Sequence, residues 1–293
     1  MTLTCGQRPA DIWMLDLDNE KVERMTFTDL QGINKDDLVE PELHHFTSFD
    51  GLTVPYWLYR GKKPSRSVVV DIHGGPEGQE RPLFSPLIQY LISEGLTIVA
   101  PNVRGSVGYG KSYHHLDDIE KRLDSVHDAA CLAEHLVEAG IADKDKIAVM
   151  GASYGGYMTL ATTAFYPDLW VAGVDTVGMS NLETFLENTA DYRRAHRESE
   201  YGSLAHHRHI LRAVSPIHKV DDITAALMVV HGSNDPRVPV SEAEQIVASL
   251  RSRNVPVEYL LYTDEGHGLS KRKNQFDCYP KVAAFLKKHL KLD

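Results

Sequence analysis

The chain has 293 residues, of which 42% are hydrophobic and 25% are charged, a composition typical of globular proteins. Its 31 basic and 41 acidic residues give a net charge of −10, which argues against nucleic acid as a partner. The N-terminus lacks the apolar core of a signal peptide and no apolar run is long enough to span a bilayer, so we expect no membrane partner. Three widely spaced cysteines match neither a metal site nor a disulfide framework, which favours a reducing, cytoplasmic location.

Residues 1–43 are predicted to form a hairpin followed by a linker. Residues 11–27 have the pattern of two short strands around a turn at 18–20, and residues 28–43 are a polar connector. We expect this hairpin to favour a homo-oligomer through three apolar residues, Ile12, Trp13 and Leu15. A second hairpin is predicted over residues 46–59, where the Asp50-Gly51 pair is typical of a type I′ turn.

From residue 67 onward, buried-strand patterns alternate with helical ones, which predicts an α/β fold with a mostly parallel sheet covered on both faces. Strands are predicted at 67–72, 96–100, 147–150, 172–177, 227–230 and 257–262. Helices are predicted at 83–94, 116–137 and 157–165. A further helix is predicted to begin at the capping box Ser241-x-x-Glu244. The last helix is predicted around 282–290, with a start or kink near Pro280. The polar segment 179–213 breaks this alternation, and we interpret it as a small helical insertion over the functional site.

The most informative motif is Gly151-Ala-Ser153-Tyr-Gly155, between a predicted strand and a predicted helix. A strand, a sharp turn and a helix form the nucleophile elbow, in which the serine hydroxyl stands at the end of the sheet. The two glycines let the strand and the helix approach each other closely. Ser153 is therefore the predicted nucleophile.

A serine nucleophile needs a base, and the base needs a group that orients it. Asp235 follows the strand at 227–230, and His267 follows the strand at 257–262. The resulting order Ser, Asp, His is that of the α/β-hydrolase fold, so we predict a Ser153–Asp235–His267 triad. The weaker alternatives to Asp235 are Asp264, which precedes His267 on the same strand end, and Asn234, which carries no charge; His231 is interpreted as structural.

Acyl transfer also requires two donors for the oxyanion. The backbone N–H of Tyr154, directly after the nucleophile, is the first candidate. The second is expected in the loop His73-Gly-Gly-Pro76, with Gly75 favoured and Gly74 as the alternative.

Other patterns favour structural interpretations. Gly105, Gly108 and Gly110 match no nucleotide fingerprint, and we expect no cofactor. We expect no metal site at His206, His207 and His209, because no acidic or cysteine ligand pattern accompanies them. A solvated helix face is predicted for four acidic residues, Asp117, Asp118, Glu120 and Asp124.

Taken together, these motifs resemble the catalytic domain of the prolyl oligopeptidase family, in particular its acylaminoacyl-peptidase branch. The matching segments, ordered as in the family, are residues 73–76, 101–110, 151–156, 231–239 and 264–268. The resemblance covers about residues 44–293 and implies an α/β-hydrolase catalytic domain there, serine hydrolysis of peptide or ester bonds, and no cofactor. Family members usually carry an N-terminal β-propeller, and residues 11–27 resemble a remnant of its last blade. Leu269 stands where the family commonly has phenylalanine.

The leading hypothesis is a serine hydrolase that cleaves peptide, acyl-aminoacyl or ester bonds through an acyl-enzyme. A carboxylesterase acting on small acyl esters would use the same site, since only the leaving group differs. A non-catalytic binding module on a hydrolase fold is the third hypothesis, against which the complete triad argues.

Overall fold

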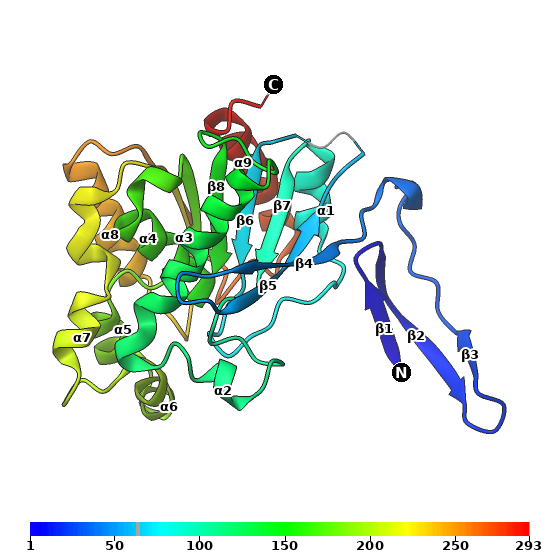
Figure 1. Ribbon diagram of the computed structural model, residues 1–293, viewed down its shortest axis with the longest axis horizontal. Coiled ribbons are helices and arrows are strands. Elements are labelled where there is room, and N and C mark those ends of the chain that lie inside the picture. The colour runs from blue at the N-terminus through cyan, green and yellow to red at the C-terminus, as the bar shows by residue number, and fades with distance from the viewer. Residues whose placement is uncertain (63–64, 293) are drawn as a thin grey trace.

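A computed structural model describes residues 1–62 and 65–292. Its main body is built on an eight-stranded sheet with the strand order β11-β10-β9-β8-β6-β7-β5-β4 (Figure 1). Six neighbouring strands, β11 to β7 in that order, are parallel, while β5 and β4 pair antiparallel at one edge. The strands span Glu42–Thr47 (β4), Thr53–Tyr59 (β5), Val68–Ile72 (β6), Thr97–Pro101 (β7), Ile147–Ala152 (β8), Ala172–Thr176 (β9), Ala226–Gly232 (β10) and Val257–Tyr262 (β11).

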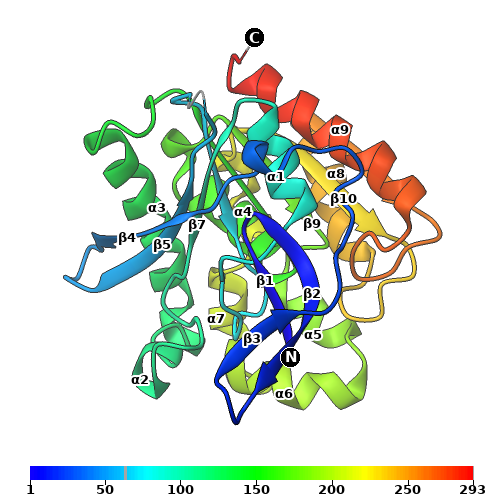
Figure 2. The same ribbon diagram turned by 90° about the vertical axis from the view of Figure 1, so that its right-hand side faces the viewer.

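Helices cover both faces of this sheet, as the alternating pattern predicts. On one face, α1 (Pro86–Ser93) and α9 (Arg272–His289) pack against strand residues such as Val69 and Met150. On the other, α3 (Arg122–Glu138), α4 (Tyr154–Phe165) and α8 (Ser241–Ser252) bury the opposite side chains of the same strands. Figure 2 shows α1 and α9 on one side of the sheet and α3 on the other. Because the central strands are buried on both faces, they are nearly continuous apolar runs.

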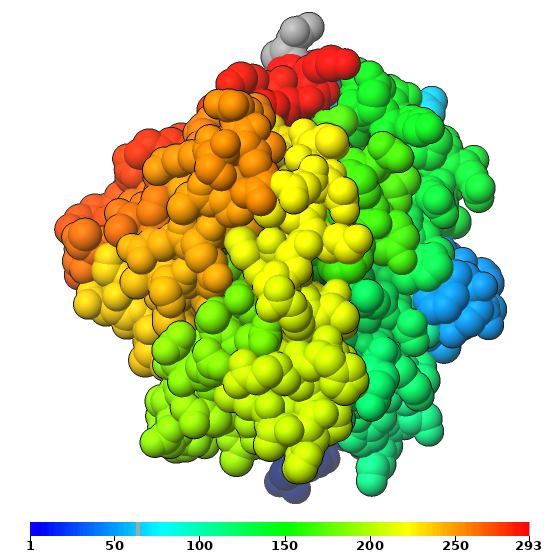
Figure 3. All heavy atoms as spheres, turned by 90° about the vertical axis from the view of Figure 1, so that its left-hand side faces the viewer, coloured from blue at the N-terminus to red at the C-terminus, as the bar shows by residue number. Residues whose placement is uncertain are grey.

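The segment predicted as an insertion forms three short helices, α5 (Leu182–Asn188), α6 (Asp191–Tyr201) and α7 (Arg208–Ala213). They lie together at one end of the main sheet, at the bottom of Figures 1 and 2. Figure 3 shows the same segment on the surface, below α8.

The long helix predicted at 116–137 begins later than expected. A short helix, α2 (Lys111–His114), comes first, and α3 begins only at Arg122. Ile119 adopts a φ of 50°, a left-handed conformation that a β-branched residue rarely takes and that no α-helix contains. The apolar spacing continues across this break, so periodicity alone could not locate it. The helix ends as predicted, with Gly140 at a φ of 69° just beyond it.

The beginnings of α9 and α8 also differ from the predictions. The last helix, α9, runs through Pro280 instead of beginning near it. Burial of Cys278 on the N-terminal side of Pro280 and of Leu286 beyond it offsets the cost of about 3 kcal/mol for an interior proline. In α8 the N-cap residue is Val240, and no side chain caps the helix, so the predicted capping box is wrong.

The hairpin of β4 and β5 forms as predicted, but its turn is not type I′. The amide of Ser48 donates to the carbonyl of Leu52, and the loop between them has three residues, of which only Gly51 has a positive φ. Phe49, the additional loop residue, stacks on His127 of α3 with ring centroids 4.0 Å apart. This contact with α3 accounts for a loop longer than the Asp-Gly pair alone suggests.

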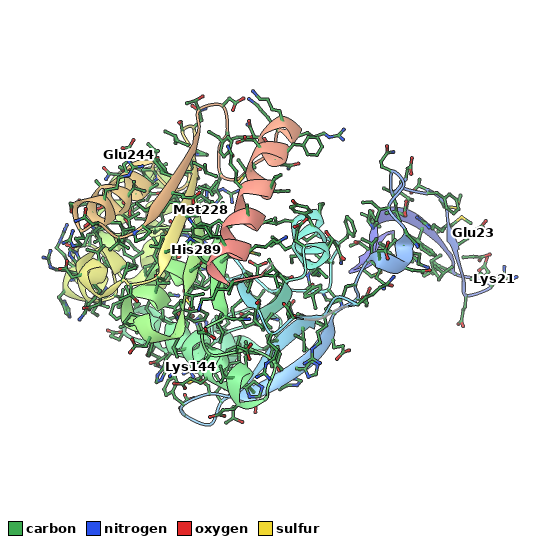
Figure 4. All side chains as sticks on the ribbon, turned by 90° about the horizontal axis from the view of Figure 1, so that it is seen from above. Lys21, Glu23, Lys144, Met228, Glu244 and His289 are labelled. Carbon is green, nitrogen blue, oxygen red and sulfur yellow. The ribbon has the colours of Figure 1, made fainter. Side chains whose placement is uncertain are left out.

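The N-terminal residues form a separate antiparallel sheet of three strands, β1 (Thr2–Cys5), β2 (Arg8–Asp16) and β3 (Lys21–Arg24). The predicted hairpin corresponds to β2 and β3. No strand is predicted from the sequence at β1, which has only four residues. The sheet projects from the main body in Figure 1, and Figure 4 shows Lys21 and Glu23 at its far end, away from Met228 in the main sheet. Gln89 of α1 connects the two parts by donating to the carbonyl of Gly6 at 2.9 Å. Ile12 is 55% exposed and Leu15 is 41% exposed, and self-association through them stays a prediction, as does the division at residue 43.

Candidate active site

The predicted nucleophile elbow forms the expected strand, sharp turn and helix. β8 ends at Ala152, α4 begins at Tyr154, and Ser153 between them has φ 59° and ψ −115°. This left-handed conformation is strained for a serine and is typical of a functional position held by its surroundings. The amide of Ser153 donates to the carbonyl of Thr176 at 2.9 Å, which ties the elbow to the end of β9.

The two glycines of the motif are required for packing at this turn. A Cβ atom on Gly155 would overlap the carbonyl oxygen of Ile72, and one on Gly151 would lie 2.5 Å from the carbonyl carbon of Gly155. Both contacts involve backbone, which cannot move aside as a flexible side chain can. Glycine is required at both positions because β6, β8 and α4 meet there.

Asp235 and His267 lie together on the loops that follow β10 and β11. His267 Nδ1 is 2.7 Å from Asp235 Oδ2, and the Asp235 side chain is fully buried. The other oxygen, Oδ1, accepts the amides of Arg237 at 2.8 Å and Val238 at 3.0 Å. Burial raises the pKa of Asp235, but the bonds from His267 and the two amides outweigh it and hold the pKa below its usual value. The carboxylate is thus charged at neutral pH and fixes the imidazole through Nδ1.

The alternatives to Asp235 make other contacts. Asp264 forms ion pairs with Lys271 at 3.0 Å and Lys273 at 2.7 Å. Asn234 donates to the carbonyl of Thr263 at 2.8 Å, which joins the two loops. His231 is buried and its Nε2 lies 3.1 Å from the carbonyl of Val238, in line with a structural interpretation.

Residues next to Ser153 and His267 in the sequence line one cavity. Gly151 and Ala152, just before Ser153, line it together with Gly268 and Leu269, just after His267. The contacts of the described residues include the His267–Asp235 bond but no hydrogen bond from the Ser153 hydroxyl to His267. Such bonds are often long in a free enzyme and tighten only when substrate binds.

The predicted oxyanion loop lies against the elbow. A Cβ atom on Gly74 would lie 3.0 Å from the carbonyl oxygen of Ala152 and 3.5 Å from Ser153 Cβ, so Gly74 is a direct neighbour of the predicted nucleophile. His73 holds this loop, since its Nε2 is 2.8 Å from Ser106 Oγ. The amide of Tyr154, the other predicted donor, is at the N-terminal end of α4, where helix amides have no partner within the helix.

A buried ionic cluster lies next to Tyr154, and no sequence motif indicated it. Arg122 is 1% exposed and forms ion pairs with Asp117 and Glu200, which are also buried. It also donates to the Tyr154 hydroxyl at 3.1 Å. Burial lowers the pKa of Arg122, but the charges around it, Asp117 first, raise it well above its usual value. The prediction that Asp117 belongs to a solvated face is therefore wrong, because the break before α3 turns its side chain inward.

Helix α6 contacts both halves of the predicted oxyanion site. Its Glu200 reaches Tyr154 through Arg122, as described above. Its Arg197 donates to the carbonyl of Gly75 at 3.1 Å and to both oxygens of Glu77, at 3.1 and 3.2 Å. The insertion is thus bonded to the elbow and to the loop after β6.

The only group of three closely spaced potential metal ligands among residues 1–62 and 65–292 is Asp117, Asp118 and Glu200. Arg122 already pairs with Asp117 and Glu200, so its guanidinium compensates the negative charge that would otherwise attract a metal ion. The three histidines at 206, 207 and 209 are not in this group, and His207 Nδ1 accepts the amide of Ser203 at 3.0 Å.

Residues 82–293 match the family model described as "Prolyl oligopeptidase family". The chain belongs to the prolyl oligopeptidase family. This member is 35% identical over 231 residues to dipeptidyl peptidase family member 6 of Caenorhabditis elegans, a match that covers 77% of this chain and 31% of that protein. It is 28% identical over 235 residues to the acylamino-acid-releasing enzyme of Arabidopsis thaliana, with 77% of this chain and 30% of that protein covered.

Among solved structures, a puromycin-hydrolyzing peptidase of Mycobacterium tuberculosis superposes with a TM-score of 0.93 at 26% identity, covering 100% of this chain and 46% of that one. The predicted α/β-hydrolase fold is confirmed by this likeness. The prolyl oligopeptidase family member described here spans about a third of the length of the curated relatives it matches. In the described part of the chain, no helix combines the length and apolarity needed to cross a membrane.

Proposed function

We propose that this chain carries the catalytic centre of a serine hydrolase that cleaves peptide, acyl-aminoacyl or ester bonds through the triad Ser153, Asp235 and His267. The observation that carries the proposal is the 2.7 Å contact of His267 Nδ1 with the buried Asp235 side chain. The residues just before Ser153 and just after His267 line one cavity, which supports the assignment of both to one site. Membership of a peptidase family and the fold shared with a puromycin-hydrolyzing peptidase support it.

In the first half-reaction, His267 Nε2 takes the proton of the Ser153 hydroxyl while Oγ bonds to the carbonyl carbon of the substrate. The carbonyl electron pair moves onto oxygen, which accepts hydrogen bonds from the Tyr154 amide and from an amide of the loop after β6, Gly75 or its neighbour Gly74. When the intermediate collapses, the bond to the amine or alcohol breaks. The leaving group takes the proton from His267, and the acyl group remains as an ester on Ser153.

In the second half-reaction, His267 removes a proton from water, and the resulting hydroxide oxygen bonds to the acyl carbon. Collapse of this intermediate releases the carboxylic acid and returns the proton to Ser153 Oγ. Asp235 stays ionised throughout. It holds the imidazole in one tautomer and stabilises the imidazolium that forms in each half-reaction.

The experiment is a comparison of matched substrates, an N-acetyl-aminoacyl p-nitroanilide and the p-nitrophenyl ester of the same acyl group. We expect wild-type protein to hydrolyse both, and Ser153→Ala to lower kcat by at least about 1,000-fold on both. Ser252→Ala, which changes an exposed serine of α8, is the matched control and should keep full activity. A Ser153→Ala protein with more than about a tenth of wild-type activity would remove this residue from its proposed role. Hydrolysis of the ester alone would restrict the proposal to esterase chemistry.

A further inference from the structure

A cavity of about 270 Å³ lies between the sheet and the helices α1 and α9, at the carboxyl ends of the strands. Its wall is mostly apolar and includes Leu87, Ile88, Met150, Val174, Leu269 and Val282. For comparison, an engineered apolar cavity of about 150 Å³ is sufficient to bind benzene. This cavity therefore has room for an aromatic ring or a branched hydrocarbon group together with a short chain.

One carboxyl group stands among these apolar residues. Asp71 is on β6, on the same face as Val69, and it lines the cavity. Within residues 1–62 and 65–292, its side chain accepts no hydrogen bond and forms no ion pair. Burial raises its pKa to about 7. A carboxyl group placed in an apolar wall without a protein partner is costly, and a ligand that donates to it would remove this cost.

The other titratable groups near Asp71 or in the cavity lining are the carboxyl group of Glu80, the hydroxyls of Tyr59 and Tyr279, and the thiol of Cys278. Burial, followed by the charge of Asp71, raises the pKa of Glu80 to about 8. Burial, followed by the charges of Glu80 and Asp71, raises the pKa of Tyr59. Tyr279 of α9 lines the cavity. In the described part of the chain, Arg81 is the cation that acts on these two carboxyl groups, through Glu80. Asp71 lines the cavity and Glu80 does not, so the Asp71 carboxylate is the negative charge that selects for a cationic ligand.

Leu269 connects this cavity with the sequence. It lines the wall next to His267, at the position where the family resemblance has phenylalanine. The larger aromatic side chain would take up part of the volume. Leucine at this position therefore leaves more of the cavity open than phenylalanine would.

We propose that this cavity binds a primary amine carried on an apolar body, whose ammonium group donates to the Asp71 carboxylate while its hydrocarbon part lies between α1, α9 and the sheet. Phenethylamine is the probe that fits this description. Binding requires neither Ser153 nor His267, so the proposal is independent of the proposed hydrolysis and is tested without turnover.

The test is calorimetric titration of the full chain with phenethylamine and with 2-phenylethanol, which has the same size and no charge. We expect a Kd on the order of 1 mM for the amine at pH 8 and binding at least about tenfold weaker for the alcohol. Asp71→Asn should weaken amine binding at least about tenfold. Glu80→Gln is the matched control for a neighbouring acid and should change the affinity less than about threefold.

Two further measurements make the test specific. From pH 5.5 to 8.5 the amine stays protonated while Asp71 ionises, so the affinity of the wild type should rise roughly 30-fold and that of Asp71→Asn should rise much less. Leu269→Phe should weaken binding by reducing the volume, with thermal unfolding confirming that both variants fold. The proposal is overturned if phenethylamine does not bind the folded wild type, if the alcohol binds equally well, or if Asp71→Asn binds as the wild type does.

The amine could belong to a substrate or to a separate ligand, and inhibition kinetics distinguish these sources. If the substrate carries the amine, phenethylamine should compete with an amine-bearing ester and raise its KM, and Asp71→Asn should abolish the preference for that ester over a neutral one. If the amine is a separate ligand, it should leave the KM of the amine-bearing ester unchanged while still binding. Either result supports the site and identifies its occupant.

Discussion

Replacing Arg122 with methionine would test the buried ionic cluster next to Tyr154. Methionine keeps most of the side-chain volume but removes the charge that Asp117 and Glu200 share. It also removes the hydrogen bond to the Tyr154 hydroxyl and the contact of the guanidinium with the Tyr201 ring, whose centroid is 4.8 Å away. Asp117 would then be a buried carboxyl group without a cation.

Removing one partner of a buried ion pair costs about 3–5 kcal/mol of unfolding free energy, because the remaining charge is uncompensated. An unfolding entropy of about 2.1 cal/mol/K per residue gives roughly 0.6 kcal/mol/K for a chain of 293 residues. We therefore expect Arg122→Met to lower Tm by about 5–8 °C. Thermal unfolding followed by circular dichroism at pH 7 measures this shift.

The triple variant Arg122→Met, Asp117→Asn, Glu200→Gln is the control, because it removes both acids together with the cation. If unpaired charge causes the loss, the triple variant should regain at least half of the Tm that Arg122→Met loses. A triple variant as unstable as Arg122→Met alone, or a single variant that loses less than about 1 °C, would refute this reasoning.

Three further predictions concern the site and its surroundings. Arg197→Met removes the donor to the Gly75 carbonyl, so kcat for the anilide should fall roughly tenfold while KM stays within about twofold of the wild-type value. A change in KM alone would contradict a positioning role. Asp235→Asn should lower kcat by about 10⁴ in the same assay, and activity near wild type would assign the orientation of His267 to another group. Burial raises the pKa of Asp71 from 3.8 to about 7, so this residue ionises at lower pH in the unfolded chain than in the folded one. The contribution of Asp71 to stability therefore falls as pH rises from 4 to 7. Asparagine cannot ionise, so Asp71→Asn should melt higher than wild type at pH 8 and about equally at pH 4, whereas a constant difference between the two pH values would show that Asp71 does not titrate in this range.

The strands of the main sheet and the elbow could be predicted because their signals are local. β6, β7 and β8 are short apolar runs, and the glycines around Ser153 are needed for contacts that the strand-turn-helix pattern itself implies. The positions of Asp235 and His267 followed from the rule that parallel strands bring their carboxyl ends to one edge of the sheet. These inferences use residues close in sequence or a general property of the fold.

The features that the sequence did not predict depend on contacts between distant segments. Arg122 and Glu200 are 78 positions apart, and their pairing is what turns a charged stretch into a buried one. The same holds for Arg197 and Gly75, which are 122 positions apart. At Pro280, burial against the sheet outweighs a local preference that pointed to a helix end. Single-sequence patterns report local preference, and these positions are decided by tertiary packing.

Covalent labelling with a fluorophosphonate tests most directly whether Ser153 is a nucleophile activated by His267. We expect one probe molecule to bind per chain and mass spectrometry to locate it on Ser153. His267→Ala should slow the reaction by several orders of magnitude while the chain remains folded. Labelling at another residue, or labelling of Ser153 at the same rate without His267, would contradict the proposed triad.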